Sequence, residues 1–106
     1  MSNVEMGNSS LYQTSLMGEI NVSYERLVEV FGTPYKYPDD GYKADVEWDG
    51  SIDGLVFTIY NYKDGKNYLG DEGLAVEDIT NWHIGGKRHR VVKKILEYIE
   101  NFPAKE

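Results

Sequence analysis

Apolar residues recur at helical spacing in two segments of the chain. The first segment is Tyr24–Phe31, where Ser23 offers an N-cap hydroxyl and Gly32 ends the helix. The second segment begins at Lys87 and keeps apolar residues three and four positions apart until Pro103 ends it. Its apolar stripe consists of Val91, Val92, Ile95, Leu96, Ile99 and Phe102. The sequence therefore predicts two helices, each with one face to bury.

Alternation of apolar and polar residues predicts four strands. Three of them are a short strand within Thr14–Val22 and the strands Tyr42–Trp48 and Leu55–Tyr62, in that order. The fourth is Thr80–Ile84, for which the end of a loop is the alternative interpretation. The third of these strands is fairly apolar on both faces, which favours a central position or contact of its tyrosine face with a partner. The residues between Trp48 and Leu55 are too few for a crossover connection, so this pair of strands is expected to be an antiparallel hairpin. Trp48 is expected to lie in the core.

The predicted order of elements is β-α-β-β-β-α. We expect an α+β fold, in which a small antiparallel sheet carries two helices packed on one face. At 106 residues the chain is long enough for one core, so residues 14–106 are expected to form a single domain. Residues 1–13 are small and polar without periodicity, and we expect them to form a flexible N-terminal arm.

Charge is distributed unevenly along the chain, which has a formal net charge of −7. Between Asp39 and Asp78 there are eleven acidic and three basic residues, whereas Lys87–Lys94 holds five of the eleven basic residues and no acid. This pattern fits a solvated acidic surface beside a basic helix start. It also fits a basic pocket in a protein that would repel long nucleic acid.

Cysteine is absent, which excludes disulfides, zinc-thiolate sites and thiol catalysis. The chain has no apolar run long enough to span a membrane and no signal-peptide pattern at its N-terminus. A cytoplasmic location is therefore the expectation.

The segment Thr80–Arg90 concentrates most of the candidate chemistry. Two glycines precede the expected helix start, where free backbone N–H groups and the helix dipole favour anions. Basic side chains follow, and an indole and an imidazole precede the glycines as a stacking ring and a switchable donor. The candidate ligand-binding residues are Trp82, His83, Gly85, Gly86, Lys87, Arg88 and Arg90. The alternative interpretation of the same residues is a tight turn into the last helix.

Other motifs carry little chemistry. The stretch Asp49–Gly54 resembles the start of a calcium loop, but Tyr60 stands where a bidentate glutamate is required, and a hairpin turn is preferred. His83 and His89 lack the spacing of a metal site, and the serines suit no nucleophilic arrangement. We therefore expect no metal site, no cofactor, no catalytic residues and no enzymatic activity.

Three stretches resemble a family of small bacteriophage proteins: Lys43–Trp48, Val56–Lys63 and Trp82–Gly86. In that family an acidic "E-W" strand, a "T-I-Y" strand and a "W-H-I-G-G" turn precede a final helix, and the resemblance covers about Ser15–Phe102. It implies a phage accessory protein that acts in the cytoplasm of the infected host. Small phage proteins of this kind often counter host defence. Anti-Thoeris and anti-CBASS sponges sequester nucleotide signals, whereas anti-CRISPRs bind a defence protein.

Three functional classes remain open from the sequence. The working hypothesis is a non-catalytic binder that sequesters a small phosphorylated, nucleotide-like signal. The alternative is an acidic inhibitor that binds a host defence protein, in which the acids between Asp39 and Asp78 imitate nucleic acid. The third class is a structural or assembly subunit of the virion. We also expect self-association, because the tyrosine face of Leu55–Tyr62 and the open sheet edges invite pairing.

Overall fold

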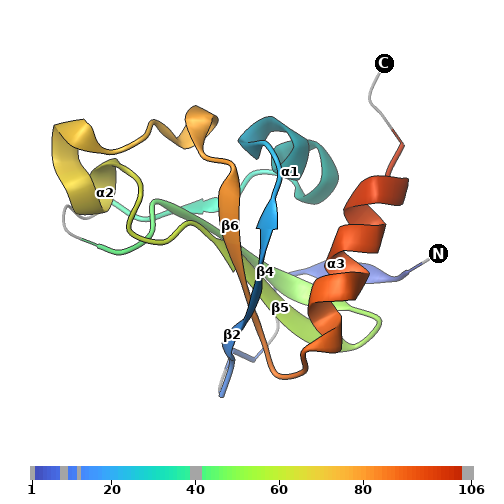
Figure 1. Ribbon diagram of the computed structural model, residues 1–106. Helices are drawn as coiled ribbons and strands as arrows, with labels where there is room; N and C mark the ends of the chain where they lie inside the picture. Colours follow the sequence, from blue (N-terminus) through green and yellow to red (C-terminus); the bar gives the residue numbers. More distant parts are fainter. Residues whose placement is uncertain (1, 8–9, 12, 39–41, 104–106) are drawn as a thin grey trace.

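The centre of the molecule is one antiparallel sheet. This computed structural model describes the chain except for residues 1, 8–9, 12, 39–41 and 104–106. The strands are β1 (Val4–Met6), β2 (Ser15–Asn21), β3 (Tyr35–Lys36), β4 (Val46–Ile52), β5 (Leu55–Tyr60) and β6 (Asn81–Gly86). Their order is β1-β4-β5-β6-β2, and β3 pairs with the same outer edge of β4 as β1 does (Figure 1). The expected α+β fold is confirmed, as is the central position of β5.

Two helices cover one face of this sheet. The helices are α1 (Tyr24–Phe31), α2 (Lys66–Leu69) and α3 (Arg90–Asn101), with 3-10 turns at Gly70–Glu72 and Val76–Asp78. The buried residues of α1 and α3 join a single cluster with the inward-facing residues of β2, β4, β5 and β6. The prediction of two helices on one face is therefore confirmed. Among the described residues no helix is long and apolar enough to cross a membrane.

The two tryptophans occupy the middle of the core. Trp48 is 2% exposed and Trp82 is fully buried, and their ring centroids lie 5.4 Å apart in an edge-on arrangement. Each indole N–H has a partner, since Trp48 donates to the Gly32 carbonyl at 2.7 Å and Trp82 to the Val22 carbonyl at 2.9 Å. These hydrogen bonds tie the two ends of α1 to the sheet. The core assignment of Trp48 is confirmed.

Strand β4 runs further than the sequence predicts. The expected strand Tyr42–Trp48 was followed by a turn from Asp49, but β4 begins at Val46 and continues to Ile52. Gly50 reads as a turn residue, yet it pairs with β1, and a Cβ there would overlap the Glu5 carbonyl oxygen. The turn itself contains Asp53 and Gly54, whose φ angles of 50° and 81° suit a two-residue hairpin.

Short elements are the other differences from the predicted arrangement. Residues 1–13 were expected to be an unstructured arm, but they include β1, which pairs with β4. β3 and α2 lie in segments that were expected to be loops, and the last helix begins at Arg90, three residues after the expected start. Elements of two to four residues show no sequence periodicity, because they span less than about one helical turn or two alternations.

A buried polar cluster fixes the loops at one end of the sheet. The fully buried Asn61 side chain accepts from the Asp45 backbone N–H at 2.8 Å and donates to the carboxylates of Asp45 and Asp64 at 2.9 and 3.0 Å. The Asn67 side chain donates to the Tyr37 carbonyl at 2.9 Å. The segment after β5 is thereby held against the segment between β3 and β4. This contact positions the tyrosines described below.

Candidate functional site

The seven candidate ligand-binding residues do not share one surface. Trp82 is fully buried in the helix-covered core, whereas the side chain of His83, the next residue along β6, lies on the opposite face of the sheet. Neighbouring residues of a strand project to opposite faces, which explains the difference. The same geometry contradicts a stacking role for Trp82 beside an anion, because its ring contacts Trp48 and Tyr24 instead.

The two glycines lie inside β6 and not at a helix start. Gly85 pairs with Thr58 on β5 and Leu16 on β2, and Gly86 also pairs with both neighbouring strands. A Cβ at Gly85 would overlap the Thr58 hydroxyl, so close packing explains this glycine. The expectation that Gly85 and Gly86 present free amides to an anion is therefore wrong.

The first turn of α3 also uses its amides internally. The N–H of Val91 donates to the Arg88 carbonyl at 3.1 Å, and the N–H of Val92 donates to the His89 carbonyl at 3.2 Å. The N-cap residue His89 makes no side-chain capping hydrogen bond. The tight turn before α3 is the interpretation that these hydrogen bonds favour.

The basic side chains remain exposed. Lys87, Arg88 and Arg90 lie on the surface around the start of α3, and no ion pair is found for them among the described residues. Lys94 is engaged, because its ammonium lies 2.9 Å from the Asp53 carboxylate. The predicted site thus leaves three cations on a surface, without the indole or the glycine amides.

His83 belongs to a different arrangement, which crosses the sheet on the face away from α1 and α3. Tyr35 pairs with Glu47, Glu47 with Tyr60, Tyr60 with His83 and His83 with Glu19. Residues directly opposite each other on neighbouring strands project to the same face. These five residues form one continuous line over β3, β4, β5, β6 and β2, which we call the cross-strand row.

Further tyrosines flank the cross-strand row. The Tyr37 ring lies 4.9 Å from that of Tyr35 and 4.4 Å from that of Tyr42, measured between centroids. At the next strands, the His83 ring lies 5.5 Å from Tyr60 and is stacked on Tyr62 at 5.0 Å. Tyr35 is 59% exposed, Tyr42 45% and Tyr62 39%. A large aromatic area therefore faces solvent beside the carboxylates.

Burial sets the electrostatics at the middle of the cross-strand row. Desolvation raises the pKa of Glu47, and the neighbouring charge of Asp49 adds to this, while the hydrogen bond from the Tyr37 hydroxyl opposes it. Desolvation also raises the pKa of Tyr60, with further contributions from Glu47 and Tyr62. The pKa of Tyr37 is raised strongly, first by desolvation and then by Glu47. These hydroxyls therefore stay protonated at neutral pH and remain hydrogen-bond donors.

One cation of the chain already uses this aromatic surface. The Lys63 ammonium lies 5.2 Å from the Tyr62 ring centroid and 5.4 Å from that of Tyr68. At the far end of the row, the His83 Nε2 lies 3.7 Å from the Glu19 carboxylate. Rings and carboxylates together favour positively charged groups over anions.

The acids are only partly gathered on this face. Glu47 and Asp49 lie two residues apart on β4 and share it, whereas Asp45 is buried in the Asn61 cluster and Asp53 lies in the hairpin turn. Asp39 and Asp40 lie outside the described residues. The four acids from Asp45 to Asp53, which the structure describes, therefore do not form one continuous face.

The sequence does not predict the cross-strand row, although it indicates which residues of each strand point away from the core. Glu47 and His83 occupy the polar positions of two predicted strands, so their direction was readable from alternation. Their alignment depends on register, which a one-residue error in a turn would change. The turn predicted at Asp49–Gly54 is several residues longer than the turn in the structure, so the register of β4 and β5 does not follow from the sequence.

Comparisons with known proteins add no relative, since no protein-family model matches the chain and no curated protein matches it significantly. The resemblance to small phage proteins stays a prediction.

Proposed function

We propose that this protein is a non-catalytic binding protein that attaches to a basic surface of a partner protein through the cross-strand row. The observation that carries the proposal is the in-register line Tyr35–Glu47–Tyr60–His83–Glu19 across five strands. Tyrosine is enriched in protein interfaces, where its ring gives contact area and its hydroxyl a hydrogen bond.

A protein fits this surface better than a nucleic acid does. Glu47, Asp49 and Glu19 place carboxylates among the rings, and the chain carries a net charge of −7, so phosphates would be repelled. An arginine or lysine of a partner can stack on a tyrosine and pair with a carboxylate at the same time. The position of Lys63 over Tyr62 and Tyr68 supports this preference.

The resemblance to small phage proteins extends the proposal to the cell. In that setting the partner is a host defence protein with a basic surface, and this protein inhibits it by occupying that surface. Binding of this kind requires no cofactor and no catalytic residue.

A capture experiment tests the proposal. The protein is immobilised and exposed to bacterial lysate, and bound proteins are identified by mass spectrometry. We expect a basic protein to be retained by the wild type and lost with Tyr35→Ser combined with Glu47→Lys. A charge reversal at a buried anchor position typically costs about 2–5 kcal/mol, which is enough to abolish capture.

A matched control reverses charge on the other side of the molecule. Arg88→Glu with Arg90→Glu changes two exposed residues outside the row and should leave capture unchanged. Far-UV circular dichroism establishes that both double variants are folded. Capture lost with the arginine pair and kept with the row pair would place the binding surface at α3 and refute the proposal.

A nucleotide-like ligand is the second candidate, favoured by one observation. Lys87, Arg88 and Arg90 are exposed, and no ion pair is found for them within the described part of the chain. Native mass spectrometry and calorimetry against cyclic nucleotides and cyclic ADP-ribose isomers test it directly. Binding below the millimolar range that Arg88→Glu and Arg90→Glu abolish would support this candidate; the absence of binding would remove it.

A further inference from the structure

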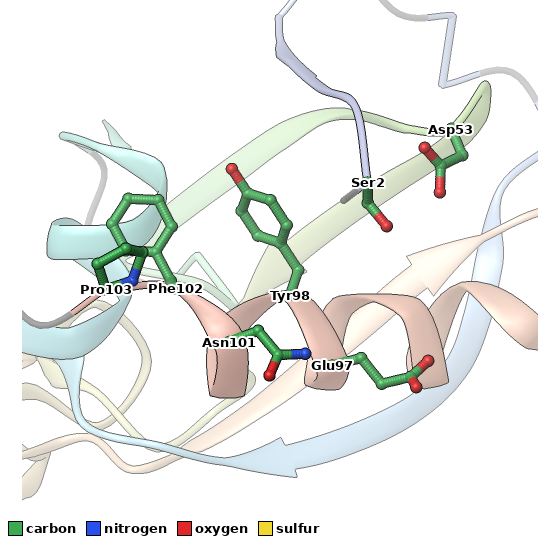
Figure 2. Close-up of a pocket in the computed structure, with 7 residues that line it drawn as sticks. All are labelled: Ser2, Asp53, Glu97, Tyr98, Asn101, Phe102 and Pro103. Atoms are coloured by element: carbon green, nitrogen blue, oxygen red, sulfur yellow. The ribbon is translucent and has the colours of Figure 1, made fainter.

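A concave site lies on the helix side of the molecule, between α3, the β4–β5 turn and the N-terminal segment (Figure 2). Its volume is about 430 Å³, which is in the range of small-molecule sites. The lining residues are Ser2, Asp53, Glu97, Tyr98, Asn101, Phe102 and Pro103. This pocket is remote from the cross-strand row, because α3 packs on the opposite face of the sheet.

The apolar wall of the pocket is built from residues at the end of α3. Tyr98 and Phe102 are four residues apart and so lie on one side of the helix, with their ring centroids 5.8 Å apart. Contacts with α1 fix both rings, since Tyr98 lies 5.8 Å from Phe31 and Phe102 lies under the Arg26 guanidinium. The same Arg26 donates to the Phe102 carbonyl at 2.7 Å. The wall is therefore preformed.

The polar wall contains two carboxylates, of which one is already paired with a lysine. Asp53 is held in place by the Asn3 backbone N–H at 2.8 Å and the Lys94 ammonium at 2.9 Å. These contacts, that of Asn3 first, lower the pKa of Asp53 to about 2, so the carboxylate is ionised at neutral pH. Glu97 supplies a second carboxylate. No Lys, Arg or His is found among the described residues that line the pocket, and the negative end of the α3 dipole lies beside it.

We propose that this pocket binds a small organic cation, an ammonium or guanidinium group carried on an apolar or aromatic body. The charged group lies beside the carboxylate of Glu97, for which no ion pair is found among the described residues, and the Ser2 hydroxyl and the Asn101 amide oxygen offer further acceptors. The body of the ligand packs on the Tyr98 and Phe102 rings. An anion of the same shape is rejected by the Glu97 carboxylate and by the helix dipole.

Three probes of one shape test the charge requirement. Phenethylamine is the cation, 2-phenylethanol the neutral analogue and 3-phenylpropanoate the anion, each titrated into ¹⁵N-labelled protein. We expect the amine to shift the amides of Ser2, Asp53, Tyr98 and Asn101. Its affinity should exceed that of the alcohol by about tenfold, which is the effect of a single charge-assisted contact.

Matched variants on α3 locate the binding. Glu97→Gln removes one exposed charge without disturbing the core, and we expect it to weaken phenethylamine binding by about threefold to tenfold. Glu100→Gln makes the same change on the same helix outside the pocket and should bind like the wild type. Equal binding of amine and alcohol, shifts elsewhere in the molecule, no shift at 10 millimolar, or no effect of Glu97→Gln would each overturn the proposal.

Discussion

The two faces of the sheet are built by the same strands and differ in almost every physical property. On the helix side, Trp48 and Ile84 are at most 2% exposed and bury only carbon surface and a satisfied indole N–H. Their chain neighbours Glu47 and His83 project to the other side, where ionisable groups alternate with tyrosines. The residues on the helix side stabilise the fold, whereas the core does not require the residues on the other side, which we call the open face.

One residue of the open face, Glu47, lowers the stability of the folded chain at neutral pH. Burial raises the pKa of Glu47, so its ionised form at neutral pH is less favourable in the folded chain than in the unfolded chain. A threonine or valine would suit a half-buried strand position without this effect. A carboxylate in that place is better explained by an interaction outside the chain than by folding.

The largest effect is expected where the helix-covered face is disrupted. Trp48→Ala removes a ring that contacts Trp82 and Tyr24, together with the hydrogen bond to Gly32. Loss of a buried tryptophan should lower the free energy of unfolding by about 3–5 kcal/mol, measured by urea denaturation. Trp48→Phe is the control, since it keeps part of the volume. An alanine variant as stable as the wild type would contradict the assignment of Trp48 to the core.

The next effect tests whether the glycine pair serves packing or a ligand. Gly85→Ala places a methyl group against the Thr58 hydroxyl, so we expect a loss of about 1–3 kcal/mol in unfolding free energy. Thr58→Ala opens the space, and the double variant should recover most of the loss. If Gly85→Ala is neutral in stability, close packing against Thr58 does not explain the glycine.

The sequence predicted the helix-covered face better than the open one. Helix α1 was predicted at Tyr24–Phe31 with both boundaries correct, because Ser23 caps it and Gly32 ends it. Trp48 was placed in the core because alternation gives a direction without requiring a partner. The apolar pattern thus predicts the helix-covered face, because the direction of each side chain follows from its position along its own strand or helix.

The candidate site was predicted less well, for two physical reasons. A Gly-Gly pair occurs both in strands and in anion-binding turns, so the sequence of Gly85 and Gly86 does not distinguish these structures. Only their pairing with β5 and β2 shows that they belong to a strand. The cross-strand row depends on the register of five strands, and β3 is two residues long. The register between two strands cannot be read from the periodicity of either strand alone.

A pH experiment sharpens the comparison at Glu47. Because the folded pKa of this acid is raised, its neutral form is favoured by folding, and that stability is present at low pH and lost as the pH rises through the folded pKa. Glu47→Gln is neutral at all pH values, so we expect it to be more stable than the wild type at pH 7.5. The advantage should shrink as the pH falls through the raised pKa of the folded state, and it should be lost below 4.5, the ordinary pKa of the group.

Urea midpoints at pH 7.5 and pH 4 measure this difference. Glu100→Gln, at an exposed position on α3, is the matched control and should behave like the wild type at both pH values. A Glu47→Gln variant that is less stable than the wild type at pH 7.5 would mean that the hydrogen bond from Tyr37 outweighs the desolvation of the carboxylate.

The smallest effect on stability is expected for two exposed residues, Leu16 on the edge strand β2 and Tyr35 in the cross-strand row. The chain is expected to self-associate, and β2 is the edge strand that pairs only with β6 among the described strands. Leu16 on β2 is 51% exposed, whereas two copies meeting through the row would oppose Glu47 to Glu47. Charge therefore favours the edge as the contact between copies, and leaves the row for a basic partner.

Sedimentation velocity distinguishes the two surfaces. We expect species above the 12.1 kDa monomer for the wild type and for Tyr35→Ser, and only the monomer for Leu16→Lys. Both substitutions should change the unfolding free energy by less than about 0.5 kcal/mol, because neither side chain is buried. If Tyr35→Ser dissociates the protein and Leu16→Lys does not, the copies meet through the cross-strand row, and a partner protein must then compete with self-association for it.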